Sequence, residues 1–173
     1  VDATDPEASI AAARTARAAG VPVFLDADSP SDAAARLLGE VDFPVVSQRF
    51  AEGIGRGVSA EAGLREMLRL GARLAVATLG ERGALGLGRD GRAVGSPAFE
   101  IEPVVARGAG VVFHAACIPA ALGGDDLETA LRTANGAAAM NCEARGAQGG
   151  LPTRAELVAF LASHRQRIWR GER

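Results

Sequence analysis

The chain has 173 residues with a formal net charge of −2, and 48% of the residues are hydrophobic against 23% charged. This composition predicts one folded domain over residues 1–173. The chain has neither a cluster of basic residues nor a long apolar run, so neither a nucleic-acid nor a membrane partner is expected. The default location is cytoplasmic. All nineteen basic residues are arginine, and the absence of lysine excludes a Walker-A phosphate loop and Schiff-base chemistry.

The first half of the chain alternates helix signals with short apolar runs. Asp5-Pro6-Glu7 combines an N-cap, a first-turn proline and an acid, and Gly20 stops the helix that follows. Ser31 and Ser59 are expected to cap two further helices. The predicted helices are 6–19, 31–38, 48–52 and one from residue 60 with Leu64, Met67, Leu68 and Leu70 on its apolar face; the predicted buried strands are 21–25, 43–47 and 74–78.

The second half predicts a hairpin and then three helices. Residues 84–88 and 92–95 flank Arg89-Asp90-Gly91 and should pair, so the G-x-G-x-x-G pattern at 86–91 is interpreted as a hairpin turn, since no helix follows it. An extended segment is expected at 99–105, and helices at 110–122, 127–142 and 154–162. This alternation predicts an α/β fold with a parallel sheet and helices on both faces.

Two glycine-rich turns are candidate binding elements. Gly108-Ala109-Gly110 runs directly into an apolar helix, where unpaired N–H groups and the helix dipole favour an anion; plain helix entry is the alternative. Thr78, Gly80 and Gly83 lie at the carboxyl end of a predicted strand, where open α/β sheets bind ligands, although a purely structural turn fits the same spacing.

Several segments together resemble the ribokinase-like (PfkB) family of carbohydrate kinases, in the family's order and spacing from about Val1 to Leu161. The resembling segments are 78–84, 105–116, the helix 127–139 with its Ala-Asn-x-Ala-Ala-Ala pattern, and the loop 145–153. The resemblance implies a three-layer, Rossmann-like, mostly parallel sheet, of which this chain is the nucleotide-binding half. The family's amino-terminal strands, sugar-binding glycines and lid are expected to be missing.

The resemblance also implies a site. Gly108, Ala109 and Gly110 would form an anion hole for the transferring phosphoryl group, and Thr78, Gly80 and Gly83 a nucleotide turn. Asn135 would border the adenine, and Gly146 would lie in a closing loop beside the nucleotide. The implied cofactors are ATP and Mg²⁺, and no protein-held metal site is predicted.

The chain departs from the family where the chemistry is done. The last Asp of the family's Asp-Thr-Thr-Gly-Ala-Gly-Asp is the catalytic base, and this chain has Val111 at that position. No catalytic residue is therefore predicted. Val105-Ala106-Arg107 replaces Asp-Thr-Thr, and the monovalent-cation site is expected to be lost with those oxygens. Arg107 could stand in as a cation near phosphates, or be an ordinary surface arginine.

These features leave three hypotheses. The first is a sugar kinase that is catalytically impaired, inactive alone, and able to bind sugar only if the missing half is supplied. The others are a non-catalytic protein that binds nucleotide or a partner in a homo- or hetero-oligomer, and an inactive gene remnant. Outside these roles, Cys117 and Cys142 are expected as buried free thiols, His114 as a packing residue, and His164 and Trp169 without a role.

Overall fold

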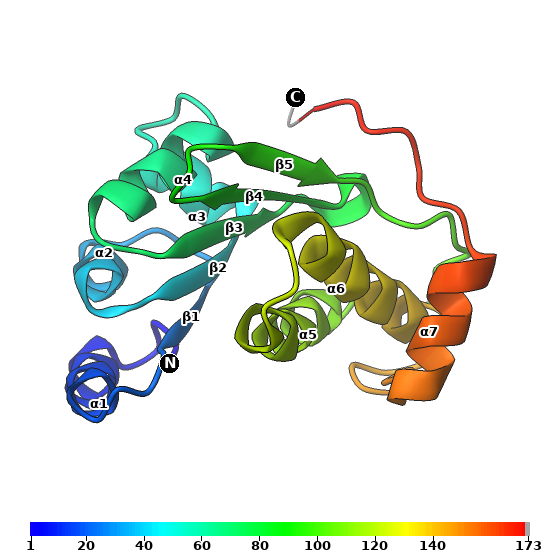
Figure 1. The fold of residues 1–173 in the computed structure, drawn as a ribbon, viewed down its shortest axis with the longest axis horizontal. Coiled ribbons are helices and arrows are strands. Elements are labelled where there is room, and N and C mark those ends of the chain that lie inside the picture. Colours follow the sequence, from blue (N-terminus) through cyan, green and yellow to red (C-terminus); the bar gives the residue numbers. More distant parts are fainter. Residues whose placement is uncertain (172–173) are drawn as a thin grey trace. The chain divides into compact units, whose positions relative to one another are not determined.

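The strands of the computed structural model, which describes residues 1–171, form one five-stranded sheet (Figure 1). In the order in which they neighbour one another they are β1 (Phe24–Ala27), β2 (Phe43–Ser47), β3 (Leu74–Thr78), β4 (Ala84–Gly88) and β5 (Ala93–Ser96). Contacts divide the described chain into two compact units, residues 1–79 with 85–93 and residues 80–84 with 94–171. The single domain expected over the whole chain stays a prediction.

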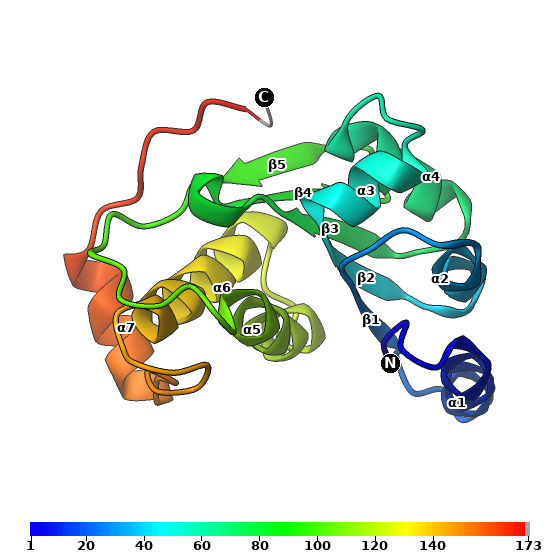
Figure 2. The same cartoon turned by 180° about the vertical axis from the view of Figure 1, so that it is seen from behind.

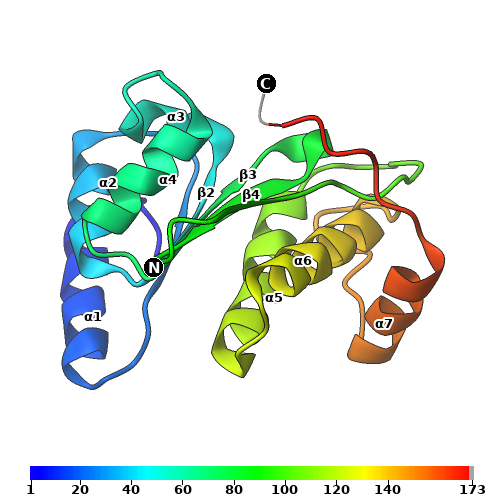
Figure 3. The same ribbon diagram turned by 45° about the horizontal axis from the view of Figure 1, so that its top comes forward.

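The first unit is a run of parallel strand–helix–strand repeats. Its helices are α1 (Pro6–Ala18), α2 (Asp32–Leu37) with the 3₁₀ turn η1 (Leu38–Glu40), α3 (Gln48–Ile54) and α4 (Ala60–Arg69). β1 pairs with β2, and β2 with β3, in parallel. When each new parallel strand joins the same edge of the sheet through a right-handed crossover, the connecting helices all lie on the same face of the sheet. Figure 3 shows α1, α2 and α4 on the same side of these strands.

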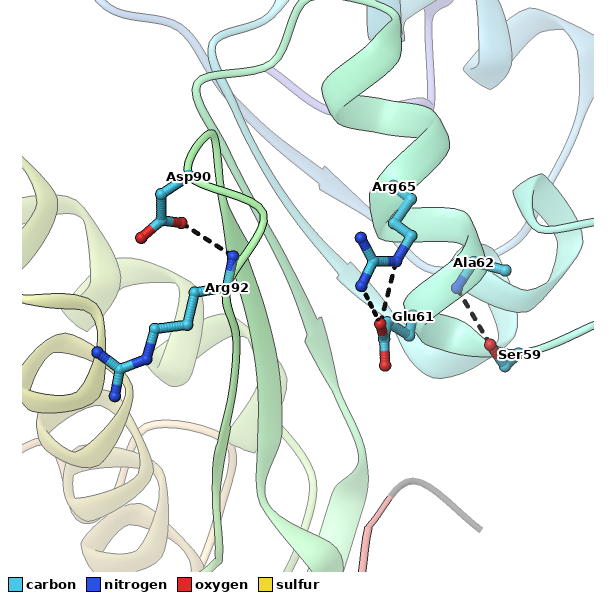
Figure 4. Close-up of polar contacts among 6 residues, drawn as sticks. All are labelled: Ser59, Glu61, Ala62, Arg65, Asp90 and Arg92. Atoms are coloured by element: carbon cyan, nitrogen blue, oxygen red, sulfur yellow. Dashed lines mark hydrogen bonds and ion pairs between the residues drawn. The ribbon is translucent and has the colours of Figure 1, made fainter.

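Local capping chemistry sets where these helices begin. The side chains of Asp5, Ser31 and Ser59 each accept a hydrogen bond from the backbone N–H three residues on, at 3.0–3.1 Å. Figure 4 shows the Ser59 cap, the ion pair between Glu61 and Arg65 in the same helix, and the hairpin turn at Asp90. The helix starts predicted from these caps, and the hairpin at 89–91, are confirmed.

Several boundaries in this unit differ from the prediction by one to three residues, and two of the differences have a clear local cause. The first strand begins at Phe24 rather than residue 21, because Pro22 has no N–H to give and the Val23 N–H bonds to the Asp42 carboxylate at 3.0 Å. Leu70 is 37% exposed rather than part of the apolar face, because α4 ends at Arg69 and Leu70 is its C-cap. The core of this unit is made by buried side chains that include Leu25, Val46, Phe50, Leu64, Met67 and Val76.

The second unit is mainly helical. It contains the 3₁₀ turn η2 (Gly80–Arg82), α5 (Ala109–Gly123), α6 (Leu127–Cys142) and α7 (Arg154–Ser163), with α6 next to both α5 and α7 (Figure 2). Phe99, Ala139 and Phe160 form its buried cluster. In the predicted extended segment 99–105, only Phe99 makes a strand-type bridge, and its partner is Gln166.

Several smaller predictions can also be compared with the described residues. His114 is buried on α5, and Cys117 and Cys142 are both free thiols, the first buried and the second half-buried. Among residues 1–171, no helix combines the length and apolar character needed to cross a bilayer.

Candidate functional site

The start of α5 forms a glycine turn that only glycine can make. We call Gly108–Val111 the anion turn. Gly108 is the N-cap in the left-handed conformation, with φ +86° and ψ −10°. A Cβ at Gly108 would overlap the carbonyl oxygen of Ala147. Both the backbone twist and the close approach therefore require glycine, and the helix begins without a side-chain cap.

The first turn of α5 leaves backbone N–H groups available. Val112 N–H donates to Gly108 O at 3.0 Å, and Ala109 N–H to Ala106 O at 3.2 Å. Among the described residues, none accepts a hydrogen bond from the N–H of Gly110 or Val111. A Cβ at Gly110 would meet nothing within 4 Å, so the space beside these groups is open. Hence Gly110 and Val111, rather than Ala109, offer free donors to an anion.

Val111 occupies an open position in this first turn. Its side chain is 65% exposed, and it can neither accept nor donate a proton. Arg107 is exposed and forms no ion pair within the part of the chain that is described, which fits the alternative of an ordinary surface arginine. The anion turn can therefore hold a negative group but supplies no acid or base.

A glycine-rich loop packs against the anion turn. Asn141, fully buried in α6, donates from Nδ2 to Ala147 O at 3.0 Å and accepts from Gly150 N–H at 3.3 Å. Because Ala147 also lies against Gly108, the structure brings the predicted Gly146 loop beside the anion turn. Asn141 was not predicted as a site residue; an amide near the end of an alanine-rich helix was the available signal.

The predicted nucleotide turn packs on the segment that follows β5. A Cβ at Gly83, where φ is +105°, would overlap the Ser96 carbonyl oxygen, and Ala98 N–H donates to Arg82 O at 3.4 Å. Gly80 begins η2. Thr78 ends β3 in the first unit, where its hydroxyl donates to Val46 O at 3.4 Å.

Asn135 reaches the same segment from α6. Its side chain is buried, and Nδ2 donates to Ser96 O at 2.9 Å, Ser96 Oγ at 3.0 Å and Pro97 O at 3.3 Å. Gly83 and Asn135, far apart in sequence, thus meet at residues 96–98, which we call the hub segment. Its residues were not predicted, because no local pattern marks Ser96 or Pro97. The Nδ2 donors of Asn135 are therefore already used within the protein.

The two thiols of the second unit are poor nucleophiles at neutral pH. Burial raises the pKa of Cys117 to about 12, and burial together with the nearby Glu143 raises the pKa of Cys142. A thiol that stays protonated at neutral pH neither attacks substrates nor binds metals. Neither thiol is therefore a candidate catalytic group.

Two hollows lie in the second unit. One, of about 680 Å³, adjoins η2 and is lined by Glu81, Arg82, Glu100, Arg167, Ile168, Arg170 and Gly171. The other, of about 710 Å³, is a mostly apolar groove among α5, α6 and α7, and its lining contains no predicted site residue.

The implied cofactors can be tested against these residues. Free N–H groups at a helix start with open space beside them fit a phosphate. Among the described residues there is no group of three or more His, Cys, Asp or Glu able to hold a metal. Mg²⁺ would accordingly be held through the nucleotide's own phosphates and water, which is its usual mode of binding.

Comparisons with known proteins bear on the family and the fold. The family model for pfkB family carbohydrate kinases matches residues 1–154. A ribokinase from Bacillus subtilis is 48% identical over 66 residues, 38% of this chain and 22% of that protein. A PfkB protein from Polaromonas is similar in structure with a TM-score of 0.76 and 26% identity, over 91% of this chain and 55% of that one. An Arabidopsis thaliana ribokinase complexed with ribose and ATP is similar in structure with a TM-score of 0.78 and 23% identity, over 90% of this chain and 52% of that one.

Proposed function

The chain belongs to the pfkB family of carbohydrate kinases, and we propose that it binds ATP or ADP through the anion turn while lacking the base for efficient phosphoryl transfer to a sugar. It spans about half the length of the solved relatives that it resembles. Sugar binding is proposed only where the other half of the family fold is supplied.

Phosphate binding is supported by the free N–H groups of Gly110 and Val111. They lie at the positive end of α5, where aligned peptide dipoles favour an anion by about 0.3–1 kcal/mol at an exposed site. The loop held by Asn141 fixes Gly108 from behind, so the donors are oriented before a ligand arrives. Mg²⁺, when bound with the nucleotide, would neutralise charge on its phosphates.

Impaired transfer rests on one observation: the exposed side chain at position 111 is a hydrocarbon. When a sugar hydroxyl attacks a phosphoryl group, its proton must be accepted, and a positioned carboxylate contributes about 10²–10⁴ in rate. Valine leaves the reaction without that acceptor. Since the position is open, a carboxylate introduced there would meet no steric barrier.

Calorimetric titration with ATP and ADP, with and without Mg²⁺, tests the binding claim. We expect saturable binding to the wild type and at least tenfold weaker binding to Gly108→Ala, which breaks the turn. Gly123→Ala, at the other end of α5 with free space around it, is the matched control and should bind like wild type. Absence of wild-type affinity for either nucleotide would reject the proposal.

A turnover assay with ATP and a panel of sugars tests the catalytic claim. Val111→Asp is expected to exceed wild type by about 10²–10⁴ once a sugar-binding half is supplied. Equal turnover by the two proteins under that condition would show that position 111 does not limit the reaction. Lack of turnover by either form alone would count against catalysis by the isolated chain.

A further inference from the structure

The residues after α7 form a strap along the hub segment. We define the strap as residues 164–169. Its backbone is paired antiparallel to residues 98–100: Glu100 N–H donates to Arg165 O at 2.9 Å, and Arg167 N–H to Ala98 O at 2.8 Å. The strap ends with the Trp169 ring seated against Gly95, where a Cβ would overlap it. Figures 1 and 2 show this part of the chain leaving α7 and running back toward β5.

Gln166 shares its acceptors with Asn135. Its Nε2 donates to Pro97 O at 2.7 Å and to Ser96 Oγ at 3.2 Å, the atoms to which Asn135 also donates. Its Oε1 accepts from Arg132 Nε at 3.2 Å, so the amide cannot flip without losing a bond at each end. Gln166 therefore holds the hub segment together with Asn135 and is itself held by Arg132 of α6.

The strap also contacts the nucleotide turn. Gly83 packs directly on the hub segment, and Arg82 O accepts a hydrogen bond from the N–H of Ala98. The carbonyl of Ala98 in turn accepts from the N–H of Arg167 in the strap. The guanidinium of Arg167 pairs with Glu81 of η2 at 3.5 Å. The strap, the nucleotide turn and Asn135 thus meet on three consecutive residues.

We propose that Gln166 is a positioning residue for the nucleotide site, acting through Ser96 and Pro97, so that strap docking and nucleotide binding strengthen each other. The inference rests on the proposed function, because it assigns a role toward that same site. If nucleotide binds more tightly when the hub segment is held, linkage requires that bound nucleotide hold the strap more firmly by the same factor. Gln166 itself need not touch the nucleotide.

The test uses the chain's only tryptophan as a reporter. With no tyrosine in the chain, intrinsic fluorescence comes from Trp169 and reports strap docking. Gln166→Ala removes the amide, and Gln166→Glu replaces the Nε2 donors with a charged carboxylate oxygen while keeping an acceptor for Arg132. Arg165→Ala, which changes an exposed neighbour and keeps the backbone pairing, is the control.

Both Gln166 variants are expected to raise the dissociation constant for ATP about fivefold or more, at the lower end of typical coupling, while Arg165→Ala leaves it unchanged. ATP should reduce acrylamide quenching of Trp169 in the wild type, and less so in Gln166→Ala. Helical circular dichroism checks folding, and if Gln166→Ala unfolds, Gln166→Glu decides.

The outcomes separate the two claims. If wild type binds ATP but both Gln166 variants bind it equally well, the inference is overturned and the proposed function stands. If wild type binds ATP and Trp169 quenching does not respond, the coupling is likewise overturned. If wild type binds no nucleotide, the proposed function fails and the role assigned to Gln166 falls with it.

Discussion

At residue 108 two constraints coincide, and both come from the backbone. The left-handed conformation is costly for any residue with a Cβ, by about 1–2 kcal/mol. The neighbouring carbonyl of Ala147 leaves no room for a Cβ either, so relaxation of one constraint does not relieve the other. The position is held by geometry, whereas the exposed Val111 three residues later has no packing reason to be apolar.

Gly108→Ala should accordingly lower the free energy of unfolding by about 2 kcal/mol or more, from backbone strain plus the displaced loop. Urea denaturation followed by circular dichroism measures this. Gly123→Ala, in ordinary helical backbone, should be neutral or stabilising by up to about 1 kcal/mol. A Gly108→Ala protein as stable as wild type would contradict the left-handed turn.

The two thiols should differ in reactivity for reasons of burial. Cys117 is 5% exposed with a pKa of about 12, whereas Cys142 is only half-buried. With a thiol-reactive chromogenic disulfide at pH 8, the native protein should label slowly at Cys142 and not at Cys117, and both should react rapidly in urea. Mass spectrometry locates the label, and fast native labelling of Cys117 would show that α5 is not packed as described.

At the scale of elements, prediction succeeded where the signal is local. Asp5, Ser31 and Ser59 predict the starts of their helices because a cap interacts with residues two or three positions away. The contacts that shape the site were not predictable in this way. Gln166 meets Ser96 across 70 residues, and no pattern in either segment indicates the pairing. The resemblance to the family predicted Gly108 and Asn135 as site residues, but it did not predict the residues that hold them in place.

The capping box of α7 gives a pH-dependent prediction. Hydrogen bonds from the Thr153 side chain and backbone lower the pKa of Glu156 below its ordinary 4.5. A carboxyl with a depressed folded pKa contributes stability above its unfolded pKa, and that contribution is lost as pH falls through the folded pKa. Stability should therefore drop more steeply for wild type than for Glu156→Gln as the pH is lowered from 5 toward 3.

Thermal unfolding monitored at intervals across that pH range provides the measurement. Glu128→Gln serves as the control, because it removes an acid from the first turn of a different helix, α6. The slope of its stability against pH should follow that of the wild type more closely. Identical slopes for wild type and Glu156→Gln would show that the capping box does not form in solution.

For the whole molecule, alternation of strands and helices predicted the α/β class, and the comparisons show the ribokinase-like fold over about half of each solved relative. Composition could not separate a binding protein from an enzyme, because both need the same core and the same glycine turns. In the function proposed above, that distinction depends on the side chain at position 111 and on groups that the other half of the family fold would supply.

Nuclear magnetic resonance of the ¹⁵N-labelled chain during titration with ADP tests the central claim most directly, since it observes the anion turn itself. The account predicts that the amide resonances of Gly110 and Val111 shift strongly downfield as nucleotide is added, as expected for N–H groups that gain a charged acceptor, while that of Gly123 stays in place. Saturable ADP binding with the Gly110 and Val111 resonances unmoved would contradict it.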